Sequence, residues 1–202
     1  MTLCPLRLDI DAVPTSPLPL DLALVKSHCA VDFDDQDDLL TTYIMAAVNA
    51  FENTCHRSIV QREHRWVLSA FPIYPYERIW LPRGKTVSVD SVEYVSNGVT
   101  IMLASSPTGT DWQEDLRGDD GGVLLPPQGE QWPTADLDAA SPVTITFTAG
   151  WDTAALPQDV LNALLWFIRT SFDDGRTDPQ KQAANLTVFE TLVSSYRLTR
   201  IY

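Results

Sequence analysis

The sequence predicts an α+β protein: a small helical bundle of three to four helices with an inserted antiparallel β subdomain. Two stretches, residues 35–55 and 160–172, repeat apolar residues every three or four positions, which is the spacing of a half-buried helix. Between them, residues 58–148 alternate apolar and polar residues, which is the spacing of strands. The two helical stretches bury their apolar faces if both ends of the chain form one layer.

The first 18 residues are predicted to form an extended N-terminal arm, because prolines at positions 5, 14 and 17 disfavour a helix there. A short helix follows. In it, Leu22, Val25 and Cys29 lie near one face at helical spacing, so that face is expected to be buried.

A longer helix is predicted from about Asp35 to Cys55, after the acidic segment VDFDDQDD. We interpret the acidic segment as an N-terminal cap and a favourable charge at the positive end of the helix dipole. An EF-hand loop starting at Asp32 would need Gly at position 37 and Glu at position 43, where the chain has Asp37 and Tyr43. No metal site is therefore expected.

The β subdomain is predicted over residues 58–150, with about five or six strands. Asn97-Gly98 lies between two alternating segments and indicates a two-residue hairpin turn, because both residues tolerate positive φ. His64 stands beside Arg62 and Arg65 in one of these strands, and we expect it on a solvated face.

The chain returns to helix after Pro157, and a weaker helical pattern covers residues 182–196. The predicted core of the helical layer contains Phe51, Leu161, Leu164, Leu165 and Ile168. The predicted divisions of the chain are listed together: an arm over 1–18, the helical layer over 19–57 and 151–196, the β subdomain over 58–150 and a C-terminal tail over 197–202.

The charge balance limits the possible functions. Twenty-seven acidic and fourteen basic residues give a net charge of −13, which disfavours binding of duplex DNA through neutralisation of its phosphates. The longest apolar helix contains Asn162 and Arg169 and is shorter than the roughly 20 residues of a membrane span, so no membrane association is expected.

No pattern typical of an enzyme is found. Cys4, Cys29 and Cys55 have no disulfide-framework spacing and are expected to be free thiols. Cys55 and His56 are neighbours on a helix, where side chains diverge by about 100°, so they do not form a catalytic dyad. We expect no catalytic residues, no cofactor and no metal. The alternative is a soluble enzyme or ligand-binding module with an unrecognised site.

Six tryptophans are many for a chain of this length. Tryptophan is enriched both in cores and at protein interfaces. Three of them, Trp112, Trp132 and Trp151, fall in predicted loops. We take Trp112 and Trp132 as the first candidates for contacts between subunits.

An ordered series of short motifs runs from residue 19 to about residue 172. It includes LPLDLALVKSHCAVDFDDQDDLLTTYIMAAVNAFENTCHRSIVQ, IWLPRGKTVSVDSVEYV and VTITFTAGW. This series resembles the head-tail connector, or adaptor, proteins of long-tailed phages and phage-like gene transfer agents. The positions that match the family pattern are Lys26, His28, Asp34 to Asp38, Glu52, Arg57, Leu81, Pro82, Gly84, Ser88, Val89, Ala149, Gly150 and Pro157.

The chain departs from the family pattern in two places. Cys55-His56 replaces Thr-Gly at the end of the long helix, so His56 is expected to adopt the left-handed conformation that glycine usually takes there. Trp151 replaces a tyrosine, which conserves a packing role.

The resemblance implies a structural virion protein rather than an enzyme. It implies a homo-oligomeric ring, typically dodecameric, in the neck of a phage-like particle that is assembled in the bacterial cytoplasm. The portal protein would lie above the ring and a tail-side neck or stopper protein below it. DNA would pass through the lumen without sequence-specific binding, and carboxylates lining that lumen would repel the DNA backbone.

The C-terminal residues YRLTRIY are apolar and cationic in an acidic protein. In the resembling family this segment reaches into the portal, which implies a portal-binding tail. The residues concerned are Tyr196, Arg197, Leu198, Arg200, Ile201 and Tyr202. The alternative is a terminus that packs on its own subunit.

Overall fold

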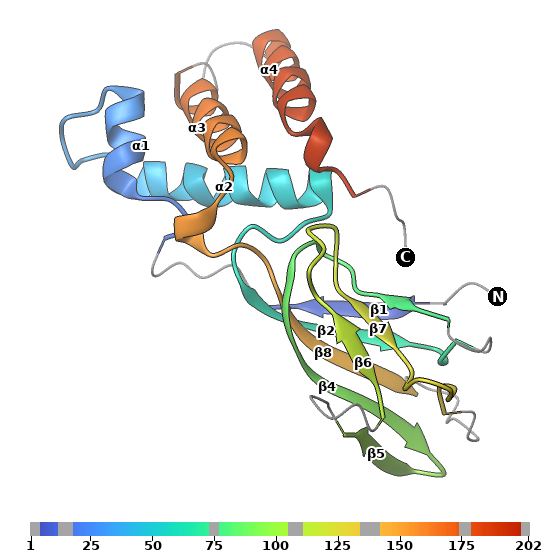
Figure 1. Cartoon of the computed structure of the whole chain (residues 1–202). Helices are drawn as coiled ribbons and strands as arrows, with labels where there is room; N and C mark the ends of the chain where they lie inside the picture. Colours follow the sequence, from blue (N-terminus) through green and yellow to red (C-terminus); the bar gives the residue numbers. More distant parts are fainter. Residues whose placement is uncertain are drawn as a thin grey trace. The chain divides into compact units, whose positions relative to one another are not determined.

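The computed structural model describes residues 5–11, 18–72, 77–104, 111–133, 142–173 and 179–198. The chain forms two compact units (Figure 1). The helical unit contains residues 12–60 and 151–199, and the β unit contains residues 1–11, 61–150 and 200–202. The α+β class with an inserted antiparallel β part is confirmed.

The helical unit is built around α3, which contacts each of the other three helices (Figure 1). Its elements are α1 (Leu22–Cys29), α2 (Asp37–Cys55), the short 3-10 helix η1 (Thr153–Ala155), α3 (Gln158–Asp173), α4 (Pro179–Leu192) and a second 3-10 helix, η2 (Ser194–Tyr196). The predicted helix over 182–196 is therefore α4 followed by η2.

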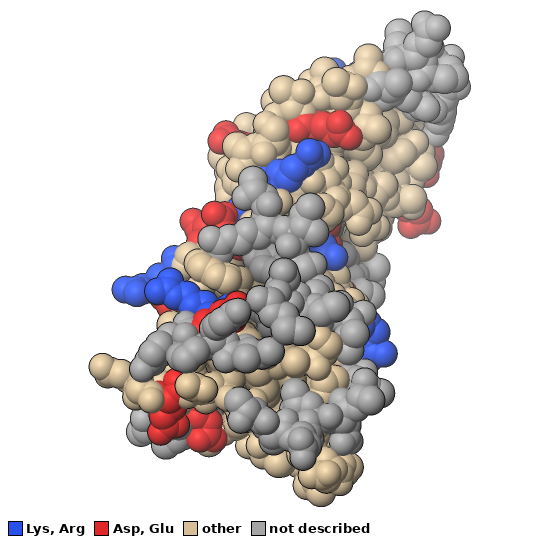
Figure 2. Space-filling view, turned by 90° about the vertical axis from the view of Figure 1, so that its right-hand side faces the viewer, with Lys and Arg blue, Asp and Glu red and all other residues tan. Residues whose placement is uncertain are grey.

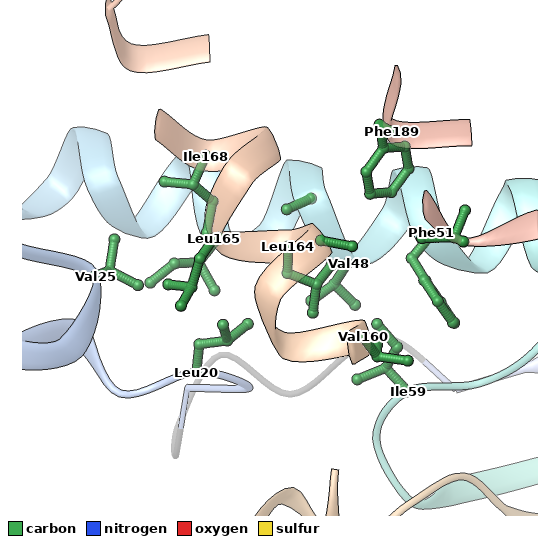
Figure 3. Packing of buried hydrophobic residues seen from close by; sticks show 14 of the residues in the cluster. Leu20, Val25, Val48, Phe51, Ile59, Val160, Leu164, Leu165, Ile168 and Phe189 are labelled. Atoms are coloured by element: carbon green, nitrogen blue, oxygen red, sulfur yellow. The ribbon is translucent and has the colours of Figure 1, made fainter. Parts of the chain in front are cut away.

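The core of the helical unit is formed by the apolar stripe of α3. Leu164 and Ile168 are fully buried, and Leu165 is nearly so. Figure 3 shows these side chains packed among residues of α1 and α2, including Val25 and Phe51. Leu161 is only half-buried, because it lies about 100° around the helix from Val160 and at the edge of the stripe.

The acidic segment before α2 does not cap the helix with a side chain. Gln36 occupies the cap position without a side-chain hydrogen bond, so the capping part of our interpretation is wrong. Asp37 and Asp38 do lie in the first turn, where their charges interact favourably with the helix dipole.

Lys26 Nζ lies 2.5 Å from Asp34 Oδ1 and 2.8 Å from Asp37 Oδ1. This hydrogen bond lowers the pKa of Asp34 and raises that of Lys26.

The β unit contains two antiparallel sheets. One has five strands in the order β1-β2-β8-β4-β5, and the other has three in the order β3-β7-β6. The strands are β1 (Pro5–Ile10), β2 (Arg62–Leu68), β3 (Ile79–Trp80), β4 (Thr86–Ser96), β5 (Val99–Leu103), β6 (Gln113–Asp115), β7 (Val123–Leu125) and β8 (Val143–Ala149). The described part of residues 58–150 thus contains seven strands, β2 to β8, rather than five or six, and β1 lies within the predicted arm.

The core of the β unit follows the alternation of its strands. On β8, Val143, Ile145 and Phe147 are fully buried, while the threonines between them are half-buried. The three-stranded sheet adds Ile79 and Leu124 to the same core. Asn97 and Gly98 have φ values of 52° and 74°, so the predicted hairpin turn between β4 and β5 is confirmed.

One glycine allows the chain before β7 to pack closely on the turn after β3. Gly121 has a φ of 136°, and a Cβ atom there would lie 2.4 Å from the carbonyl oxygen of Leu81. Next to it, the N–H of Gly122 donates to Thr86 Oγ1 at 2.8 Å, and the N–H of Leu81 donates to the Gly122 carbonyl at 2.8 Å. These bonds join the small sheet to the start of β4.

His64 is buried, so the expected solvated position is wrong. It shares the inward face of β2 with Trp66 and Leu68, because side chains two residues apart on a strand point the same way. Its Nδ1 lies 2.9 Å from the Arg62 carbonyl oxygen and its ring packs 5.3 Å from that of Phe147. Burial lowers its pKa to about 4.

We expect Leu164→Ala to lower the free energy of unfolding of the helical unit by about 2 to 5 kcal/mol, because it leaves a cavity in a closed core. Leu186→Ala on α4 is the matched control, since Leu186 is 46% exposed and its truncation leaves no cavity. Urea titrations followed by circular dichroism compare the variants. Equal midpoints for the two would contradict this packing.

We expect His64 to make stability depend on pH. Its pKa is lower in the folded chain than the ordinary 6.5, so unfolding takes up a proton at acidic pH. The stabilisation is complete above pH 6.5 and is lost as the pH falls toward 4. Unfolding free energies measured between pH 7 and pH 4 should fall more steeply for the native chain than for His64→Phe, which cannot titrate. Parallel curves would refute the assignment.

Candidate assembly interface

The C-terminal end of α2 is closed by a turn of mostly buried residues. His56 adopts φ 56° and ψ 27°, so the predicted left-handed position after the helix is confirmed. Glu52, which is 5% exposed, accepts a hydrogen bond on Oε1 from the N–H of Ile59 at 2.9 Å. This hydrogen bond ties Ile59, which follows the turn, back to Glu52 near the end of α2. Arg57 and Ser58 are buried in the same turn.

The C-terminal segment supplies partners for backbone groups at this helix end. The N–H of Leu198 donates to the Cys55 carbonyl at 3.0 Å, and Arg197 Nε donates to the Thr54 carbonyl at 3.1 Å. The last carbonyls of a helix have no partner within it, and a cation there is favourable for the helix dipole. Because α2 has no basic residue in its own last turn, Arg197 brings this cation from the other end of the chain.

Aromatic contacts fix the same segment from the other side. The Tyr196 ring lies 6.3 Å from the Trp151 ring in an edge-to-face arrangement and 6.4 Å from the Phe51 ring. Phe51 and Trp151 are themselves 6.2 Å apart. Arg57 Nε donates to the Tyr196 carbonyl. Phe51, Trp151 and Tyr196 therefore form one aromatic cluster that ties η2 to α2.

The predicted portal-binding tail is divided by this arrangement. Tyr196 is half-buried and Leu198 is 7% exposed, and both pack on their own helical unit. Arg197 is exposed apart from its bond to Thr54. Arg200, Ile201 and Tyr202 lie outside the described residues. Contact of this segment with a portal stays a prediction, and it now falls mainly on those last residues.

The two tryptophans predicted at subunit contacts are buried in the β unit. Trp112 and Trp132 are each 2% exposed. The Trp132 ring is stacked on Phe71 at 5.3 Å, and its Nε1 donates to the Glu77 carbonyl at 2.9 Å. Both rings belong to the hydrophobic core of the β unit, so they offer a neighbouring subunit almost no surface. A role in subunit contacts stays a prediction, and burial argues for an indirect one.

The thiols of the helical unit are packed as apolar groups. Cys55 Sγ donates to the Val193 carbonyl at 3.4 Å, and burial raises the pKa of this thiol to about 11. Burial also raises the pKa of Cys29. Both are free thiols, and Cys4 lies outside the described residues. Raised pKa values leave little thiolate at neutral pH, so neither cysteine has the environment of a nucleophile.

The described ranges contain no group of three or more His, Cys, Asp or Glu side chains that could hold a metal ion. Within them, no helix has both the length and the apolarity needed to cross a bilayer.

Acidic and basic side chains are interspersed on the face shown in Figure 2. That face therefore presents no broad basic area for the DNA backbone among its described residues.

Comparisons with known proteins give one family and one fold. Residues 19–96 match the family model of phage gp6-like head-tail connector proteins. No curated protein sequence matches the chain significantly.

Among solved structures, a chain from the neck of an empty gene transfer agent particle, computed with sixfold symmetry, has a TM-score of 0.73 at 22% identity, covering 98% of both chains. A chain from the virion of the native particle has a TM-score of 0.70 at 22% identity, with the same coverage. A chain from the native neck, computed with twelvefold symmetry, has a TM-score of 0.67 at 23% identity and covers 100% of this chain and 98% of that one.

The resemblance found in the sequence is thus confirmed by two comparisons that do not depend on it. The chain is similar to phage gp6-like head-tail connector proteins over residues 19–96, and along its whole length it has the fold of a chain in the neck of gene transfer agent particles.

Proposed function

We propose that the protein is a structural virion protein, a head-tail adaptor that forms a ring under the capsid portal and joins the head to the tail. The observation that carries this proposal is the match of the fold over 98% of both chains to a gene transfer agent neck chain, together with the connector family model over residues 19–96. The family model compares amino-acid sequences and the structural match compares folds, and both lead to the same class of protein.

The proposed assembly is a homo-oligomeric ring of twelve copies in the neck of a phage-like particle. Support comes from the similar neck structures, which were computed with sixfold and twelvefold symmetry. Closed rings of identical subunits need a head-to-tail interface between two different surfaces of each copy. The portal would contact the ring on the head side, and a neck or stopper protein on the tail side.

Passage of DNA through the ring is consistent with the charge of the chain. A net charge of −13 repels the phosphate backbone, so DNA can slide rather than bind. Specific recognition of bases would need cationic contacts to position the duplex first, and this composition does not favour them.

The alternative of an enzyme or ligand-binding module has less support. Burial raises the pKa values of Cys29 and Cys55, and His64, whose pKa burial lowers, is enclosed in the β core. The family model and the similar structures are those of connector and neck proteins.

Disruption of the gene tests the adaptor role directly. We expect filled heads that are separate from tails, since the joint between them is missing. Electron microscopy of particles from the producing cells gives the readout, and the unmodified gene supplied in trans should restore joined particles. Complete particles in the disrupted strain would refute the proposal.

Removal of residues 199–202 tests the tail. This truncation keeps Tyr196, Arg197 and Leu198, which close the end of α2, so we expect unfolding free energy to stay unchanged while attachment to portal-bearing heads is lost. Tyr196→Ala is the contrasting variant, because it opens the aromatic cluster and should lower stability itself. A truncated chain that joins heads normally would show that the tail is no anchor.

A further inference from the structure

The longest stretch of the chain without Asp, Glu, Lys or Arg is residues 94–110. It contains the end of β4, the Asn97-Gly98 turn and all of β5. In a chain of net charge −13, copies repel one another wherever their acidic surfaces meet. Residues 97–102 of this segment are exposed, so copies can meet there without charge repulsion.

β5 is an edge strand of the five-stranded sheet. Its side chains are unusually apolar for a surface strand: Val99 is 60% exposed, Ile101 37% and Met102 65%. Edge strands are normally protected from pairing with other chains by charges, prolines or bulges. β5 has no charge and no proline, and its register with β4 has no bulge.

The free backbone groups of β5 can be assigned from the hairpin. A two-residue turn makes the flanking residues, Ser96 and Val99, a hydrogen-bonded pair, and bonded pairs then alternate along an antiparallel ladder. The N–H and C=O groups of Thr100 and Met102 therefore point away from β4, toward the outer edge. Both residues are exposed.

The opposite edge of the same sheet is β1. The N–H of Asp11 donates to the Glu63 carbonyl at 3.2 Å, so by the same alternation the backbone groups of Leu8 and Ile10 point outward. Arg7 Nε and Asp9 Oδ2 lie 2.8 Å apart, which neutralises the charges on this strand. This edge thus also presents no net charge to a neighbour.

We propose that β5 of one copy pairs with β1 of the next copy, so that the five-stranded sheets join edge to edge in the assembly. The inference rests on the proposed ring, which requires two different and complementary surfaces on each copy. The four antiparallel steps from β1 to β5 make these two strands run in the same direction. A rotation that continues the sheet from copy to copy therefore pairs them in parallel, which is the weaker of the two pairings.

Met102→Pro tests the backbone pairing. Proline removes the outward N–H of an edge residue, and β4 loses no hydrogen bond. We expect the concentration for half-association, measured by sedimentation of the purified full chain, to rise roughly tenfold or more. Met102→Thr keeps the N–H and is the matched control, for which we expect a much smaller change. Circular dichroism checks that both variants fold.

A mixing experiment tests the direction of pairing. Met102→Pro retains an intact β1 edge, so it accepts β5 of an unmodified copy but offers no strand in return. In excess it should shorten the oligomers of the unmodified chain. If β5 strands instead paired with each other, Met102→Pro would not join the oligomers, and an excess of it would not change their size. That result would overturn the inference.

Photo-crosslinking identifies the neighbour. With a benzoylphenylalanine at position 99, we expect crosslinks to residues 5–11 of a second copy. A chain that stays monomeric at every concentration without such crosslinks would overturn the inference. The adaptor proposal would survive that result, because a ring could close through other surfaces. Conversely, β5–β1 crosslinks in a chain that is absent from particle necks would refute the adaptor role alone.

Discussion

The helical unit depends on hydrogen-bond donors that reach the last carbonyl groups of α2 from outside the helix. A helix of this length ends with carbonyls that have no partner within it, and here the end lies among buried residues. Leu198 and Arg197 supply the donors from the far end of the chain, while Glu52 holds the following turn through Ile59. Because α3 packs on α2 and α4 packs on α3, the chain after α4 returns to that end of α2. The aromatic cluster of Phe51, Trp151 and Tyr196 packs η2 against α2 next to these bonds.

The β unit has a separate core and is stabilised by close packing between its two sheets. Its large sheet buries one face, and the small sheet covers that face through the close approach at Gly121 and the bonds of Thr86 and Leu81. Trp112 and Trp132 complete this cover, which is why they are not available as surface anchors. Each unit thus has its own hydrophobic cluster. A change in one core is expected to act first on the unit that contains it.

The closure of the α2 end and the packing of the two sheets leave different parts of the chain free of these contacts. In the helical unit, Arg197 and Leu198 donate hydrogen bonds to the end of α2, so the portal contact that we propose is assigned to residues 199–202. In the β unit, the core uses the inward faces of the strands, and the two edges of the large sheet remain. The pairing that we propose for β5 and β1 joins two strands without net charge, so it avoids the repulsion between copies of this acidic chain.

The sequence by itself determined the helices, the hairpin at Asn97-Gly98, the left-handed position of His56 and the connector resemblance, because each depends on residues close together in the chain. It also contained the inward position of His64, two residues before Trp66, although the neighbouring arginines led us to a solvated face. Only the tertiary structure decided what depends on distant residues. Arg197 bonds to Thr54, β1 pairs with β2, and Trp112 and Trp132 are covered by their own unit. Periodicity reports which face of an element is apolar, but the element that covers this face is chosen by packing across the whole chain.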